Sequence, residues 1–139
     1  MEYHEDDQSG DEFDAYLYGV GPEYQKKRKV MNLDEYQTEA LKTAIYKNCG
    51  NNLYYPTLLM AAETGEISNI VQKIMRDKED ILFVEDQEKL AKEAGDVLWA
   101  LAAFCHEIGY DLSEVAEINI KKLRDRQTRG TIMGSGDDR

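Results

Sequence analysis

The sequence has few cysteines, few prolines and no long apolar run. Its two cysteines, Cys49 and Cys105, stand apart and form no CxxC pair, so we expect reduced thiols and no disulfide framework. The longest uncharged apolar run, residues 97–105, is far shorter than the roughly 18 residues that span a bilayer. The acidic N-terminus is unlike a secretory signal. We therefore expect a soluble, cytoplasmic protein with no membrane partner.

Basic residues are also scarce. The 17 lysines and arginines face 28 acidic residues, which gives a formal net charge of −11. A general nucleic-acid binder normally carries a basic face, so this balance argues against DNA or RNA as the partner. It leaves room for a small anionic substrate, because bound cations reverse the local charge of a site.

The chain of 139 residues is long enough for one domain. Residues 1–31 are acidic and contain tyrosines and one basic run, but they show no sustained helical or strand period. We interpret them as an N-terminal arm that is either disordered or docked through its tyrosines on a neighbouring subunit. Residues 32–139 form the expected main domain.

Apolar residues in the main domain recur at helical spacing, and no strand pattern interrupts them. Asn32 is a suitable N-cap, and Asp111 followed by Glu114 resembles a capping box. Gly50 and Gly109 are expected helix stops. The sequence predicts an all-α antiparallel four-helix bundle, with helices over about 33–47, 56–76, 86–108 and 112–129.

Two glutamates lie on the apolar face of the second predicted helix. At about 100° per residue, Glu63 and Glu66 fall within the stripe formed by Leu59, Ile67 and Ile70. An acid on the polar face of a helix is simply solvated, whereas an acid within a buried stripe needs a partner.

The third predicted helix repeats this arrangement. Glu93 aligns with Val97, Ala100 and Phe104, and Asp96 lies at the edge of the same face. Two alternatives remain open: the four acids pair with lysine or arginine, or both helical faces are misassigned. Otherwise the acids face a common interior and need cations between them.

The ligand chemistry of the four acids favours a hard cation. Carboxylates without cysteine or histidine suit Mg²⁺ or Mn²⁺. A di-iron four-helix site is the rival, but it places histidine three residues after a glutamate. Around the helix axis, His106 lies more than about 100° away from the stripe that contains Glu93, so it is expected at the surface.

The fourth predicted helix carries polar and basic groups on its inward face. Asn119, Lys122 and Arg126 lie beside Leu112 and Val115. Ammonium and guanidinium groups bind phosphate oxygens well, but they could equally neutralise the acids directly. Both interpretations stay open at the level of the residues.

These motifs together resemble the MazG-like all-α nucleoside triphosphate pyrophosphohydrolases. The family signature is EExxE, a spacer and ExxD. Here it reads Ala62-Glu63-Thr64-Gly65-Glu66, then the spacer, then Glu93-Ala94-Gly95-Asp96. The block from Asn119 to Arg126 is similar to the last core helix of the family. Ala62 departs from the motif, which has glutamate there, and this bears on the number of bound metal ions.

The resemblance implies metal-dependent hydrolysis of a nucleoside triphosphate to the monophosphate and pyrophosphate, controlling or cleaning the dNTP pool. We lean toward a purine deoxynucleotide as substrate. Metal ligands would be Glu63, Glu66, Glu93 and Asp96; Glu66, with Glu63, would take the catalytic role of accepting the proton of water. Lys122 and Arg126 would hold the phosphates, and Asn119 would contact the sugar or base.

The resemblance also implies a homodimer or homotetramer with active sites near subunit contacts. Trp99, Ala103 and Ile118 lie off the main apolar stripes, which is consistent with burial against a partner; for Trp99 we expect either core or subunit packing. Two functions of other classes remain as alternatives: a non-catalytic helical interaction module with a structural cation site, and a di-iron carboxylate protein.

Overall fold

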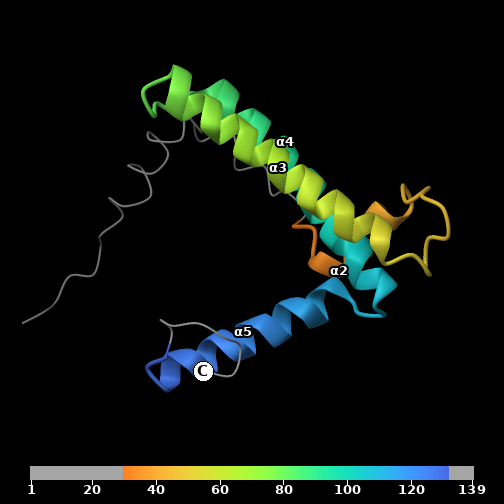
Figure 1. Ribbon diagram of the computed structural model, residues 1–139. Helices are drawn as coiled ribbons and strands as arrows, with labels where there is room; N and C mark the ends of the chain where they lie inside the picture. The colour runs from red at the N-terminus through yellow and green to blue at the C-terminus, as the bar shows by residue number, and fades with distance from the viewer. Residues whose placement is uncertain (1–29, 132–139) are drawn as a thin grey trace, which may run out of the picture. The chain divides into compact units, whose positions relative to one another are not determined.

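The computed structural model describes residues 30–131, and within them all regular structure is helical (Figure 1). The N-terminal arm up to residue 29 and the tail from residue 132 lie outside the described residues, as does the expected docking of the arm. The all-α prediction is confirmed. The helices are α2 (Leu33–Leu41), α3 (Tyr54–Asp77), α4 (Val84–Glu107) and α5 (Leu112–Thr128).

Helix α2 begins where the sequence predicts, but it ends before the predicted position. The Glu35 backbone N–H donates to the Asn32 side chain at 2.8 Å, and the Asn32 N–H donates to Glu35 at 3.3 Å. The predicted end near residue 47 is wrong, because the helix ends at Leu41. There the Ala40 carbonyl accepts bonds from the Thr43 hydroxyl at 2.7 Å and the Trp99 indole at 3.2 Å. The end of the helix thus combines a local turn, in which the Thr43 N–H also donates to the Ala40 carbonyl, with a tertiary contact from α4.

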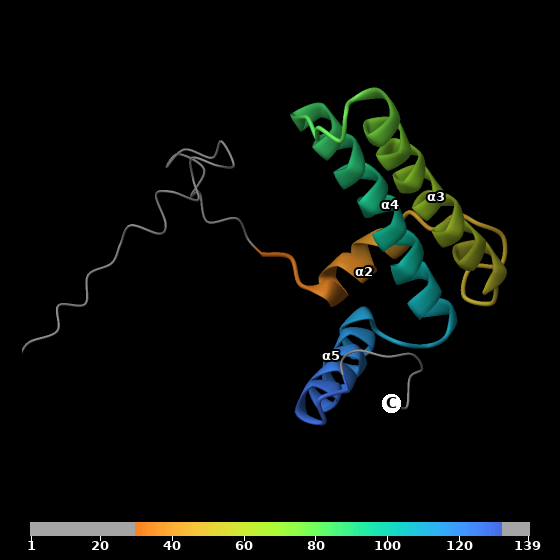
Figure 2. The ribbon, with the colours of Figure 1, turned by 60° about the vertical axis from the view of Figure 1, so that its left-hand side comes forward.

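Helices α3 and α4 pack against each other along most of their lengths (Figure 2). Pro56 lies in the first turn of α3, where its missing N–H is not needed for the helix. At the far end, Lys78 and Asp86 close the hairpin with an ion pair of 2.5 Å, and the Asp86 side chain is only 5% exposed. The hairpin is therefore tied at the turn and paired throughout.

The core lies at the C-terminal half of α4, where α2 and the start of α5 also pack. Its buried members are Ala40, Ala102, Cys105 and Leu112, with partly buried aromatic and aliphatic residues around them. Because two elements cover α4 here, burial extends around the helix instead of following one stripe.

The expected burial of Ala103 against a partner is therefore wrong, whereas Trp99 packs on the chain's own core, which was one of its two expected places. Ala103 is 1% exposed within the chain itself, and Trp99 is half-buried beside α2. Ile118, the third residue of that expectation, remains 56% exposed.

Two polar side chains of α2 fix the start of α5. The buried Gln37 amide donates to the Ala102 and Tyr110 carbonyls, both at 3.2 Å, and accepts from the Leu112 N–H at 2.8 Å. Asp34 accepts from the backbone N–H and the hydroxyl of Ser113. These bonds anchor the first turn of α5 to α2.

The loop between α2 and α3 is held by the last residue of α4. Glu107 accepts hydrogen bonds from the Tyr46 hydroxyl at 2.6 Å, the Gly50 N–H at 2.8 Å and the Asn52 N–H at 2.7 Å. Burial alone would raise the pKa of Glu107, but these hydrogen bonds outweigh it and lower the pKa. Gly50 adopts a φ of 88°, a left-handed conformation that favours glycine.

None of the helices among residues 30–131 is long and apolar enough to cross a membrane.

Candidate metal centre

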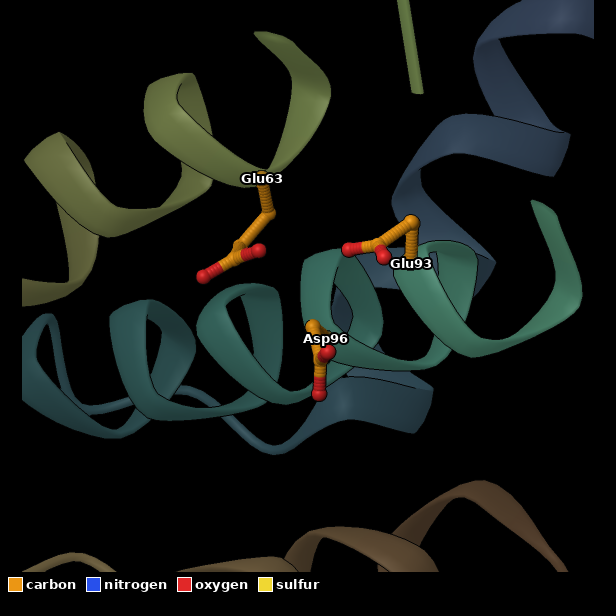
Figure 3. Close-up of side chains that lie close together, drawn as sticks. All are labelled: Glu63, Glu93 and Asp96. Atoms are coloured by element: carbon orange, nitrogen blue, oxygen red, sulfur yellow. The ribbon is translucent and has the colours of Figure 1, made fainter. Parts of the chain in front are cut away.

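Three of the four predicted acids come together between α3 and α4. Glu63 extends from α3 toward α4, which carries Glu93 and Asp96 one turn apart (Figure 3). Each residue offers one carboxylate oxygen, and these oxygens lie within 4.8 Å of one another. We call Glu63, Glu93 and Asp96 the three-acid cluster. The helical period places the acids on facing sides, and the α3–α4 pairing joins them.

The cluster concentrates negative charge at a half-open position. Glu63 and Glu93 are half-buried, whereas Asp96 is exposed. Burial, followed by the charges of Asp96, Glu93 and Glu66, raises the pKa of Glu63. Carboxylates that repel one another in this way gain stability from a cation placed between them.

The four predicted acids could instead have been neutralised by lysine or arginine. The part of the chain that the structure describes does not support this alternative. Its ion pairs involve other acids, such as Glu39, Asp77, Asp86 and Asp125. Within residues 30–131, none of Glu63, Glu66, Glu93 and Asp96 is paired with a lysine or arginine. The negative charge of the cluster is therefore available to an external cation.

Glu66 lies outside the three-acid cluster. It is exposed, one turn beyond Glu63 on α3, and its charge still contributes to the raised pKa of Glu63. Ala62, where the resemblance places a further glutamate, is also exposed. The expected interior position is thus wrong for Asp96 and Glu66, because two helices alone do not enclose the space between them.

The donor set fits a hard divalent cation. All three groups are carboxylates, and the oxygen-only chemistry suits Mg²⁺ or Mn²⁺. His106 is exposed near the end of α4 and lines a separate cavity of about 160 Å³ with Asp34 and Asp111. No histidine joins the three-acid cluster among residues 30–131, so the described chain lacks the donor pattern of a di-iron site.

The three predicted phosphate and sugar contacts lie on α5. Asn119 is exposed, Lys122 is half-buried and Arg126 is buried. Helix α5 packs on α2 and α4, but it makes no extensive contact with α3. The chain's own packing therefore does not place the inward face of α5 against the helix that carries Glu63.

Sequence reasoning missed Tyr36 as a neighbour of the cluster. Burial, and then the negative charge of Asp96, raises the pKa of this phenol. In the sequence Tyr36 was only one apolar-face residue of the first helix, and nothing local linked it to Asp96. Its place near the acids depends on how α2 packs on α4.

Comparison with known proteins identifies related sequences. Residues 55–130 match the sequence model of the MazG nucleotide pyrophosphohydrolase domain. The Gene 37 protein of Mycobacterium phage L5 is 41% identical over 114 residues, covering 78% of this chain and 100% of the phage protein. No solved structure matches. The matched domain spans α3, α4 and α5, and so includes every predicted site residue.

Proposed function

Because the chain belongs to the MazG nucleotide pyrophosphohydrolase family, we propose that it hydrolyses nucleoside triphosphates to the monophosphate and pyrophosphate. The substrate we propose is a deoxynucleoside triphosphate, and a purine one would be tested first. The proposed role is to control or clean the dNTP pool. The observation that carries the proposal is the three-acid cluster, whose carboxylates have no basic partner among residues 30–131.

The acids of α3 and α4 have the metal-binding role in this proposal. Glu63, Glu93 and Asp96, with Glu66 one turn away, would hold Mg²⁺ or Mn²⁺, two or more ions per site. Such ions, when bound, neutralise phosphate oxygens and lower the pKa of a coordinated water. Ala62 removes one carboxylate from the family motif, so fewer protein oxygens share the cations.

The remaining groups would position substrate and move a proton. Lys122 and Arg126 would bind phosphate oxygens, and Asn119 would contact the sugar or base. Glu66 would accept the proton of the attacking water, because it is the exposed acid next to the cluster. The bond between the α and β phosphates breaks, and pyrophosphate leaves with the electron pair of the bridging oxygen.

We further propose that the protein works as a homodimer or homotetramer in the cytoplasm, without nucleic acid. Large apolar side chains that stay exposed on α3 and α5 support assembly, including Leu58 at 70%, Met75 at 63% and Ile118 at 56%. Apolar surface of this kind on a short helical chain is typical of a subunit contact.

A panel of nucleoside and deoxynucleoside triphosphates with Mg²⁺ or Mn²⁺ tests the activity, with products separated by ion exchange. Glu93→Gln should lose turnover while keeping its helical circular dichroism, because it removes a cluster oxygen donor without changing volume. Glu88→Gln, an exposed position on the same helix, is the matched control and should stay active. Failure of the wild-type protein to hydrolyse any nucleotide would refute the proposal. Cation binding without turnover would instead favour the interaction module.

A further inference from the structure

The three-acid cluster has the size of the donor set of a single cation. Its carboxylate oxygens, one each from Glu63, Glu93 and Asp96, all lie within 4.8 Å of one another. Oxygens on opposite sides of one Mg²⁺ are about 4.2 Å apart, because each Mg–O bond is about 2.1 Å long. Small rotations of the side chains therefore bring all three oxygens to one ion. Two ions, at the spacing of about 3.5–4 Å found in two-metal sites, would have to share the same three groups.

The charge of the cluster is also balanced best by one divalent cation. Three ionised carboxylates carry a charge of −3, so one divalent ion leaves −1 and two ions leave +1. Mg²⁺ is usually held by one or two carboxylates and completes its coordination with water and substrate phosphates. A second ion at the cluster therefore lacks protein oxygens and negative charge until an anion binds beside it.

Glu66 could help to hold a second ion, but no carboxylate stands beside it on its own side of α3. Side chains four residues apart on a helix are neighbours, with about 5–6 Å between their Cβ atoms. The residue four positions before Glu66 is Ala62, which is exposed and offers no donor atom. Among residues 30–131, the three-acid cluster is the only group of three metal-ligating side chains close enough to share an ion.

The space next to Glu66 is open. Glu66 is exposed, and a side-chain carbon added at the preceding residue, Gly65, would meet nothing within 4 Å. The other ligands of an ion at Glu66 must therefore come from water or from a bound molecule. Phosphate oxygens suit this position because they supply both ligand atoms and negative charge.

We infer that Glu63, Glu93 and Asp96 hold one divalent cation in the nucleotide-free protein, and that Glu66 holds a second one only together with phosphate oxygens of the substrate. The inference deepens the proposed function and rests on it for the identity of the substrate, whereas the first ion does not depend on it. Ala62 sets this order, because a carboxylate at its position would give the second ion another protein ligand. Of the two or more ions of the working site, the protein alone thus holds one.

Electron paramagnetic resonance of bound Mn²⁺ tests the first ion without requiring turnover. Two Mn²⁺ ions about 4 Å apart couple magnetically, and their spectrum differs from that of an isolated ion. The nucleotide-free wild-type chain should bind one tight Mn²⁺ and show no coupling. Glu93→Gln should lose this ion, and it gives the baseline for weak binding elsewhere on an acidic chain. A coupled spectrum, or two tight ions, in the nucleotide-free wild type would overturn the inference.

A substrate analogue tests the second ion. A deoxynucleoside triphosphate with an NH group in place of the oxygen between the α and β phosphorus atoms resists cleavage at that bond, so the bound state persists. Adding this analogue with excess Mn²⁺ should produce the coupled spectrum in the wild type. Glu66→Gln should keep the tight ion of the cluster but give no coupling with the analogue. An analogue-bound wild type with isolated ions only, or unchanged coupling in Glu66→Gln, would contradict the inference.

A gain of the second ion tests the role of Ala62. Ala62→Glu should show the coupled spectrum without any nucleotide, because the new carboxylate and Glu66 lie about 40° apart around α3. Ala61→Glu is the matched control. It adds the same charge at an exposed position of the same helix but points about 140° away from Glu66, so it should still bind one tight ion. Equal ion counts in the two variants, both checked for helical circular dichroism, would refute the role of Ala62.

The outcomes separate the inference from the proposed function. A wild type that neither binds the analogue nor hydrolyses any nucleotide would refute the proposed function. The count of tight ions in the nucleotide-free wild type and in the Ala62→Glu and Ala61→Glu variants would still decide the inference, because none of these measurements uses a nucleotide.

Discussion

Replacing Glu107 by glutamine should destabilise the protein through one specific mismatch. The Glu107 carboxylate accepts three hydrogen bonds from the loop between α2 and α3. In the variant, one carbonyl oxygen can still accept from the Tyr46 hydroxyl and the Gly50 N–H. The new amide NH₂ then faces the Asn52 N–H, which is 2.7 Å from the carboxylate oxygen in the wild type. Two donors would face each other where a charged acceptor had been.

The magnitude follows from the lost charged hydrogen bond. A hydrogen bond to a charged group contributes about 1.5–3 kcal/mol, and the unsatisfied N–H adds to its loss. Because the loop is partly solvated, we expect about 2 kcal/mol of lost stability. For a domain of about 100 residues, this corresponds to a fall in Tm of roughly 10 °C. Tyr46→Phe removes one bond and should cost about 1 kcal/mol.

The fall in Tm is measured by thermal unfolding, monitored by circular dichroism at a fixed protein concentration. Glu88→Gln is the matched control. The pH dependence is a second check. Since hydrogen bonds lower the folded pKa of Glu107, its contribution is present above the unfolded value of about 4.3 and disappears as the pH falls through the folded pKa. The difference in Tm from wild type should therefore narrow at acidic pH. A difference that is absent at pH 7, or equal to that of Glu88→Gln, would refute the reasoning.

Three further predictions concern the α3–α4 hairpin. Glu63→Gln should raise the Tm of the metal-free protein, because it removes a carboxylate whose pKa is raised by burial and by repulsion from the neighbouring acids. The same variant should show a smaller gain in Tm when Mg²⁺ is added. An unchanged response to Mg²⁺ would argue against Glu63 as a ligand. Gly65→Ala should stabilise α3 by about 0.5–1 kcal/mol, measured by denaturant titration, because alanine favours a helix and its added carbon meets nothing within 4 Å. A loss of stability would mean that another surface approaches this position. Asp86→Asn should lower the Tm at pH 7 by leaving Lys78 without its carboxylate. This difference in Tm from the wild type should shrink below about pH 4, because the Lys78 hydrogen bond lowers the pKa of Asp86 in the folded state. A difference in Tm that does not change with pH would contradict this cause.

Local signals in the sequence were sufficient to predict that the four helices exist and where α2 begins. The reciprocal bonds between Asn32 and Glu35 and the left-handed φ of Gly109 lie where cap and stop residues were expected. The end of α2 was missed, and one of the contacts made there, the bond from the Trp99 indole to the Ala40 carbonyl, comes from another helix. Helix starts are encoded within a few residues, whereas this helix end also involves a distant side chain.

The sequence by itself determined the all-α class and placed acids at matching positions of two helices, because a period of 3.6 residues is a local property. The MazG signature is likewise local. Only the tertiary structure decided that Glu63, Glu93 and Asp96 share one group, with their oxygens within 4.8 Å, while Glu66 stays outside it. It also decided that α5 leaves α3 largely uncovered. A helical wheel gives the direction of a side chain within its own helix, but the pairing and crossing of helices depend on contacts between residues far apart in the chain.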